Sequence, residues 1–259
     1  MDAPQQINDA AWSDPRLVAE YATTALRPPE AAILDRHREA LAGRVLELGC
    51  GGGRLSGHLL ALGCELHGID RIPTMVEHCR AAYPAGTFAT GDLRDLSALE
   101  PASFDAVVAG FNVLDVLGHD ERLGVLRTLH ALLRPGGTLV FSSHNLAAAD
   151  DRRPPTRLRG EGLRAAARNL RRLPVRLRNS RRARRHERRD GDHALLNDMA
   201  NDYDALHYCI GRDAQAEQLA GCGFTLIECL DLDGGAVGPG EDATRCHELH
   251  YVARAAPAG

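Results

Sequence analysis

Residues 45–55 read Val45-Leu46-Glu47-Leu48-Gly49-Cys50-Gly51-Gly52-Gly53-Arg54-Leu55, and this stretch decides the fold of the chain. The short, largely apolar stretch 44–48 is typical of a buried strand, and leucines recur at helical spacing between positions 53 and 62. The alternating glycines can adopt positive φ and place no Cβ between the loop and a ligand. The stretch therefore predicts a strand that turns sharply into a helix around a nucleotide-like cofactor.

The spacing of the glycines excludes two common nucleotide-binding loops. A dinucleotide fingerprint needs its third glycine at position 54 or, counted from Gly51 and Gly53, at position 56, where the chain has Arg54 and Ser56. A phosphate loop needs Gly-Lys-Ser/Thr, and the chain contains no lysine. The remaining pattern, Glu47-x-Gly49-x-Gly51-x-Gly53, resembles the first motif of the class I S-adenosylmethionine-dependent methyltransferases.

Further segments follow in the order that this resemblance requires. Asp70 ends a predicted strand at 65–69, a place where a carboxylate can accept both ribose hydroxyls. Asp92 follows the next predicted strand in a Gly-Asp-Leu motif, whose acid faces the adenine amino group in the family. Segments 104–112 and 132–141 resemble the fourth and fifth strands. The resemblance implies S-adenosylmethionine as the cofactor and S-adenosylhomocysteine as its product.

Residues in these motifs, beside them or in the N-terminal segment are predicted to contact the cofactor. They are Tyr21, Glu47, Gly49, Gly51, Gly53, Arg54, Asp70, Arg71, Asp92, Leu93 and Phe111. Tyr21 would come from N-terminal helices that the resemblance places as a lid over the cofactor. Arg54 either reaches the cofactor carboxylate or forms a salt bridge with a neighbouring acid, and the sequence leaves both open.

The fold class implied by the resemblance is α/β, with a doubly wound, seven-stranded mixed sheet whose last two strands form an antiparallel hairpin. Residues 1–43 are predicted to form the helical lid and 44–143 the cofactor-binding core. A mainly helical substrate cap, residues 144–211, is inserted after the fifth strand, and residues 212–259 complete the core. Pro174 is expected to interrupt a helix in the cap, and 181–189 to be mobile.

Methyl transfer is an in-line displacement at a carbon that positive sulfur activates, so alignment supplies much of the catalysis, about 7 to 11 kcal/mol. A hydroxyl acceptor also benefits from a general base. His144 follows the fifth strand, where open α/β sheets place their ligands, and is predicted to be a base or a substrate orienter. Asp115 and His207 are the other catalytic candidates. Each also has a structural interpretation, namely loop hydrogen bonding, helix capping or packing.

Polar residues near these candidates are predicted to bind the acceptor. Asn145 lies beside His144, and Tyr203 and Tyr208 combine two phenols in the cap, which suits a polar ring such as a sugar or phenol. No metal site is predicted, because no tight His/Asp spacing points to one. The acceptor is therefore expected to be a small molecule.

The composition suits an enzyme of the cytoplasm. No apolar run reaches 18 residues and no signal peptide opens the chain, so we expect no membrane segment. The seven cysteines are odd in number and form no C-x-x-C pair, which predicts reduced thiols.

The charge is concentrated in the predicted cap. Residues 152–189 contain 16 arginines and two acids, whereas the whole chain has a net charge of -4. The stretch is interpreted as a solvated helix neutralised by acids elsewhere in the chain or in a homodimer partner, or as a site for an anionic substrate or polymer. It lacks interleaved aromatic residues, which disfavours single-stranded nucleic acid.

Three functions remain open on the sequence. The favoured one is S-adenosylmethionine-dependent methylation of an oxygen or nitrogen of a small molecule, such as a sugar, metabolite or natural-product intermediate. The alternatives are an RNA methyltransferase that uses the arginine-rich stretch, and a non-catalytic partner subunit that only binds the cofactor.

Overall fold

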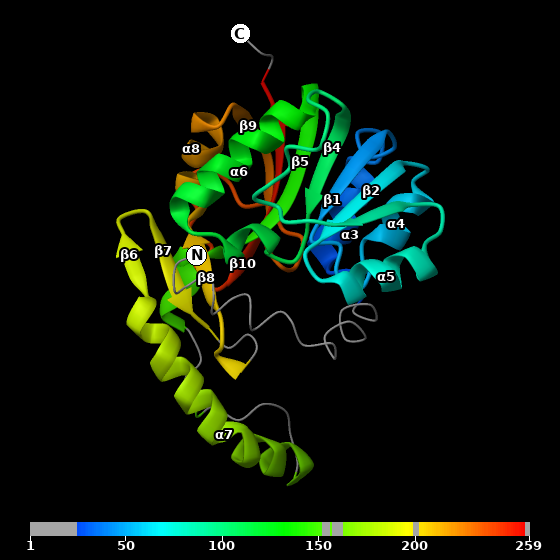
Figure 1. Ribbon diagram of the computed structural model, residues 1–259. Helices are drawn as coiled ribbons and strands as arrows, with labels where there is room; N and C mark the ends of the chain where they lie inside the picture. The colour runs from blue at the N-terminus through cyan, green and yellow to red at the C-terminus, as the bar shows by residue number, and fades with distance from the viewer. Residues whose placement is uncertain (1–24, 152–155, 157–162, 199–201, 257–259) are drawn as a thin grey trace.

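The computed structural model describes residues 25–151, 156, 163–198 and 202–256, without the side chains of 150, 151, 163–166 and 168. Its centre is a mixed sheet in which the first five strands of the core run parallel (Figure 1). In spatial order these strands are β3 (Thr87–Thr90), β2 (Glu65–Asp70), β1 (Arg44–Leu48), β4 (Phe104–Ala109) and β5 (Leu133–Asn145). Their order reverses between β1 and β4, which makes the sheet doubly wound.

The core sheet is completed by the hairpin that the family resemblance implies. The strand β10 (Glu248–Ala255) pairs antiparallel with β5, and β9 (Phe224–Leu230) pairs antiparallel with β10. The α/β class and the doubly wound mixed sheet are therefore confirmed. The expected count of seven strands is wrong, because the cap adds three more among the described residues.

Helices cover both faces of this sheet, because alternate residues of each strand point to opposite sides. Leu46 and Val107 join the cluster packed under α6 (His119–Leu132) and α8 (Arg212–Gly221). Val45 and Val108 face the other way, toward the second cluster. That second face is covered by α3 (Pro28–Arg36), α4 (Ser56–Ala61) and α5 (Pro73–Ala82), as Figure 1 shows. Two 3-10 turns, η1 (Val113–Val116) and η2 (Leu146–Asp151), follow β4 and β5.

The cap extends the core sheet, which the sequence did not predict. The last two residues of β5 pair in parallel with β8 (Leu206–Ile210), His144 opposite Cys209 and Asn145 opposite Ile210. Antiparallel to β8 lies β7 (His193–Asn197), followed by β6 (Arg188–Asp190), so that the sheet has ten strands among the described residues. Because these strands continue the core sheet, the cap is attached to the core through backbone hydrogen bonds.

The arginine-rich segment forms one long helix, α7 (Leu163–Ala183), which extends away from the core in Figure 1. The expected interruption at Pro174 is wrong, because the turns after the proline pack against the cap: Arg176, Asn179 and Ala183 are buried. Residues 181–189, which we expected to be mobile, form the end of α7, the turn η3 (Arg184–His186) and the first residues of β6, which pairs with β7. None of the described helices is long and apolar enough to cross a membrane.

Candidate active site

The glycine loop after β1 adopts the backbone conformation expected of it. Gly49, Gly51 and Gly53 have φ values of 61°, 53° and 82°, a region that side chains with a Cβ rarely adopt. A Cβ on Gly53 would lie 2.4 Å from the ring of Tyr83, whereas near Gly51 the closest atom is a backbone oxygen at 3.9 Å. Gly53 is therefore required for packing against the protein, and Gly51 leaves space beside the loop for a ligand.

Asp70 ties this loop to the end of β2. Its Oδ2 accepts a hydrogen bond of 2.8 Å from the Gly51 N–H, and its Oδ1 accepts one of 2.8 Å from the Ile72 N–H. Burial raises the pKa of Asp70, although these backbone bonds oppose the shift. The Asp70 side chain thus lies where two adjacent parallel strands end, which is where it would have to lie to bind the cofactor ribose. Ribose binding by Asp70 stays a prediction.

Glu47 lies within β1 and is 2% exposed. The Ser56 hydroxyl donates to its Oε2 over 2.5 Å, linking the strand to the first residue of α4. Burial raises the pKa of Glu47 to about 7, since it outweighs the Ser56 hydrogen bond and the charge of Arg54. The first motif therefore contains a carboxyl group that exchanges its proton near neutral pH.

Arg54 forms the salt bridge that was one of its two predicted roles. Its two terminal nitrogens lie 2.5 and 2.6 Å from the carboxylate oxygens of Glu30 on α3, and both side chains are buried. Burial would raise the pKa of Glu30, but Arg54 outweighs it and lowers that pKa. The Arg54 guanidinium also lies 5.0 Å from the ring centre of Phe111, which follows β4 at a φ of 56°.

The other predicted cofactor residues are distributed around the same edge. Asp92 accepts hydrogen bonds from the Arg94 backbone and side chain, which lower its pKa. Leu93 and Arg71 are partly exposed beside β3 and β2. Tyr21 lies outside the described residues.

Asp115 is the centre of a buried network at the end of β5. Its Oδ1 lies 2.7 Å from Arg122 Nη1 and accepts a 2.7 Å hydrogen bond from the Ser143 hydroxyl. Its Oδ2 accepts from the His144 N–H and lies 2.7 Å from His144 Nδ1. Both Asp115 and Arg122 are fully buried. The two predicted catalytic residues Asp115 and His144 are therefore in direct contact, and Asp115 fixes the orientation of the imidazole.

His144 lies between two carboxylates. Asp115 contacts its Nδ1, and Asp198 Oδ2 lies 3.4 Å from its Nε2. Burial alone would lower the pKa of His144, but the hydrogen bonds and charges of the two aspartates outweigh it and raise that pKa to about 10. Without another cation, the imidazole is protonated at neutral pH, which favours the predicted orienting role over that of a general base.

His207, the third catalytic candidate, lies on β8 beside the same aspartate. Its Nδ1 is 3.0 Å from Asp198 Oδ2, and its ring stacks on His144 with centroids 4.6 Å apart. Burial would raise the pKa of Asp198, but His207 and His144 hold it well below its usual range. Two imidazoles and one carboxylate thus meet where the cap joins the core.

The three predicted substrate residues are engaged in contacts within the protein. The Asn145 amide donates to the backbone oxygens of Asp242, Ala243 and Cys246, at distances of 2.9 to 3.1 Å. Tyr208 Oη lies 2.8 Å from His119 Nδ1, and burial raises the pKa of Tyr208 to about 12. Tyr203 is 3% exposed. These placements support packing roles, and substrate binding by these residues stays a prediction.

Sequence reasoning missed Arg122, Ser143 and Asp198. Arg122 gave a usable signal, because it lies on the same face of α6 as the apolar residues three, four and seven positions later, where a charge requires a partner. Ser143 precedes His144 in a buried strand. Asp198 gave no signal, since only the pairing of β7 with β8 brings it to the histidines.

Comparison with known proteins agrees with this architecture. Residues 45–137 match the family model described as a methyltransferase domain. The ubiquinone biosynthesis O-methyltransferase of Xanthomonas campestris pv. campestris (strain B100) is 37% identical over 118 residues, which are 43% of this chain and 48% of that protein. The chain thus spans about half the length of the curated relatives it matches.

Solved structures resemble nearly the whole chain. A 1,6-didemethyltoxoflavin-N1-methyltransferase from Burkholderia thailandensis, with its substrate and S-adenosylhomocysteine bound, has a TM-score of 0.57 at 19% identity, covering 99% of this chain and 92% of that one. An amino pentose methyltransferase from Micromonospora echinaspora has a TM-score of 0.56 at 20% identity, covering 93% and 95%. At these identities the likeness shows the fold. Residues 45–137 therefore match a methyltransferase domain, and the fold of the chain is that of these solved methyltransferases.

Proposed function

We propose that the chain transfers a methyl group from S-adenosylmethionine to an oxygen or nitrogen of a small molecule. The observation that carries the proposal is the arrangement of two sites on one sheet edge. The glycine loop and Asp70 lie at the ends of β1 and β2, and the His144–Asp115 pair lies at the end of β5. Parallel strands present their carboxyl ends at the same edge, so a donor and an acceptor bound there would be neighbours.

Residues of this chain would hold the cofactor through the loop and the strand ends. Asp70 would accept hydrogen bonds from the ribose hydroxyls, and Asp92 would accept one from the adenine amino group. Bound S-adenosylmethionine supplies a methyl carbon activated by positive sulfur. The protein then has to align the acceptor and exclude water. Alignment alone can lower the activation barrier by about 7 to 11 kcal/mol.

The charge of His144 narrows the class of acceptor. An imidazole that is protonated and held between Asp115 and Asp198 cannot remove a proton from the acceptor. We infer an acceptor that needs no base, either a neutral amine or an oxygen that is already anionic. His207, stacked on His144, would serve the same acceptor group.

Turnover tests this function. The purified chain is incubated with S-adenosylmethionine and separate acceptor panels of acidic phenols, carboxylates and amino sugars, and S-adenosylhomocysteine is measured by mass spectrometry. We expect product with at least one acidic or amine panel. Binding of S-adenosylhomocysteine without turnover on any panel would instead support the non-catalytic partner subunit.

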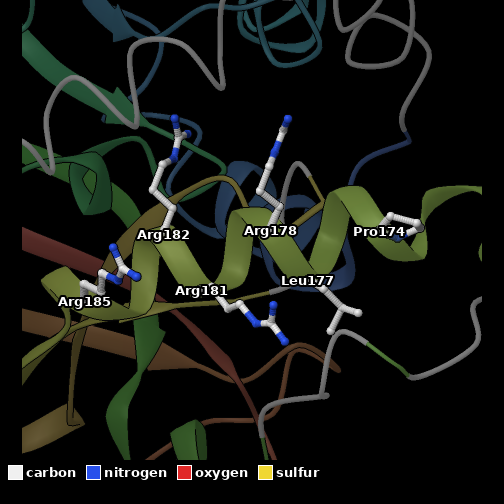
Figure 2. A pocket seen from close by; sticks show the side chains of 6 residues that line it. All are labelled: Pro174, Leu177, Arg178, Arg181, Arg182 and Arg185. Carbon is white, nitrogen blue, oxygen red and sulfur yellow. The ribbon is translucent and has the colours of Figure 1, made fainter.

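An RNA substrate is the second candidate, and the outer surface of α7 favours it. A cavity of about 480 Å³ is lined by Pro174, Leu177, Arg178, Arg181, Arg182 and Arg185. Figure 2 shows Arg178 and Arg182 extending in the same direction from the helix. However, Arg182 pairs with Asp204, and Arg176 with Asp202, so acids of the cap neutralise part of this charge. RNA binding would weaken with salt at a logarithmic slope of roughly -0.7 per neutralised phosphate, and a salt-independent substrate constant would exclude it.

A homodimer and a cytoplasmic location complete the proposal. Outside the arginine-rich segment the chain is acidic, so two copies could neutralise one another; sedimentation at low and high salt would test this. The cytoplasm is supported by the cysteines, all seven of which are described and free.

A further inference from the structure

We propose that His144, Asp198 and His207 form a binding site for a divalent transition-metal ion. Each residue offers one ligand atom, and these atoms all lie within 4.8 Å of one another. Asp198 Oδ2 is 3.4 Å from His144 Nε2 and 3.0 Å from His207 Nδ1. A single carboxylate oxygen therefore lies next to both imidazoles, an arrangement in which one cation can contact all three side chains.

The backbone of three elements fixes this geometry. His144 lies in β5, His207 lies in β8, and Asp198 directly follows β7. The ladder pairs His144 with Cys209 and His207 with Leu196. Strand pairing holds both histidines and ends one residue before Asp198, so the site is formed before any ion binds. An ion there would join the core to the cap.

The surroundings of His144 match the outer shell of a metal site. Histidine ligands almost always donate their second ring N–H to a carboxylate, backbone carbonyl or water, which fixes the tautomer and the ring orientation. Here Asp115 Oδ2 lies 2.7 Å from His144 Nδ1, leaving Nε2 directed to Asp198. Asp115 is itself held by Arg122 and Ser143. This support is independent of the three ligand atoms.

The ligand set selects the class of metal. Two imidazoles and one carboxylate suit Zn²⁺, Fe²⁺, Co²⁺ or Mn²⁺, whereas Mg²⁺ and Ca²⁺ prefer oxygen ligands alone. Three protein ligands are the number that catalytic zinc sites use, with water or substrate as the fourth. An ion here would attract the anionic oxygen of an acceptor; that role rests on the proposed function, but metal binding does not.

Metal titration of the full chain, freed of metal with a chelator, tests the proposal. We expect Zn²⁺ to bind at one ion per chain in equilibrium dialysis. Asp198→Asn and His207→Gln, each removing a ligand, should weaken binding by more than the roughly 10- to 100-fold typical of outer-shell changes, and Asp115→Asn should weaken it within that range. His193→Gln is the matched control, because His193 lies on β7 and stacks on His119 outside the cluster.

Co²⁺ separates this site from the cysteines without any variant. A site of nitrogen and oxygen ligands gives only weak visible bands, whereas thiolate ligands add intense near-ultraviolet charge-transfer absorption. Any one of three results would overturn the proposal. These are a lack of stoichiometric metal binding, a spectrum with thiolate bands, and unchanged metal affinity in folded Asp198→Asn and His207→Gln. Binding of S-adenosylhomocysteine is measured in parallel. If the chain binds S-adenosylhomocysteine but no metal ion, only the metal site is rejected. If it binds the metal ion but no S-adenosylhomocysteine, only the methyltransferase proposal is rejected.

Discussion

Replacing Glu47 with glutamine should increase the free energy of unfolding at pH 8. Glu47 is buried, and its pKa in the folded chain is about 7, against an ordinary value of 4.5. At a pH between these two pKa values, the folded state keeps a proton that the unfolded state has released. The free energy of unfolding therefore falls as pH rises from 4.5 to 7, and it stays low above pH 7. A difference of about 2.5 units at 1.36 kcal/mol each corresponds to about 3 kcal/mol.

Glutamine avoids this loss because it does not ionise, and its carbonyl can still accept the Ser56 hydrogen bond. Urea denaturation of both proteins without cofactor, at intervals from pH 5 to 8, would measure the difference by linear extrapolation. We expect Glu47→Gln to be more stable by up to about 3 kcal/mol at pH 8, with the gap closing toward pH 5. Glu77→Gln, at an exposed position on α5, is the control. A gap that is absent at pH 8, or independent of pH, would refute the reasoning.

Two further substitutions test the packing of the two sites. Gly53→Ala should destabilise the fold by about 2 kcal/mol or more, since its Cβ would lie 2.4 Å from Tyr83. The control Gly63→Ala, at a similar φ in open space, should cost only about 1 to 2 kcal/mol. Equal losses of stability in thermal denaturation would contradict this. Arg122→Met should lower the free energy of unfolding by about 3 to 5 kcal/mol, because it removes one of the two cations that contact the fully buried Asp115. A loss under about 1 kcal/mol in urea titration would show that His144 alone stabilises Asp115.

The cofactor half of the molecule could be predicted because its signals are local. A strand, a glycine turn and a helix follow one another within residues 44–62, so apolar spacing and backbone freedom identify them. The positive φ values at Gly49, Gly51 and Gly53 fulfil that expectation. Asp70 could be placed for the same reason, since it ends a short strand in which polar and apolar residues alternate.

The acceptor half could be predicted only in part. The positions of His144 and Asp115 just after predicted strands identified them as candidates. Their contact, however, depends on η1 packing beside the end of β5. Asp198 joins them only through the pairing of β7 with β8 and of β8 with β5, and α7 separates β5 from the other two strands in the sequence. The sequence predicted no metal site, and the three side chains of this cluster come together only in the folded chain.

The helix α7 illustrates how tertiary packing outweighs local preference. Pro174 removes a backbone hydrogen bond and normally costs a helix about 3 kcal/mol. The Arg176 guanidinium, which is buried, bonds to Asp202 and Asn169, and Asn179 donates to the Asp202 backbone. These contacts hold the helix across the proline, and none of them can be read from the arginine-rich sequence alone.

The central claim, that the glycine loop and Asp70 bind S-adenosylmethionine, is tested most directly by calorimetric titration with S-adenosylhomocysteine. The wild-type chain should bind one molecule per chain. Asp70→Ala removes the acceptor of the ribose hydroxyls, and hydrogen bonds to a charged group contribute about 1.5 to 3 kcal/mol, so affinity should fall at least about 10-fold. Asp35→Ala, at an exposed position on α3, should bind as the wild type does. No binding by the wild type, or equal affinity in Asp70→Ala, would contradict the claim.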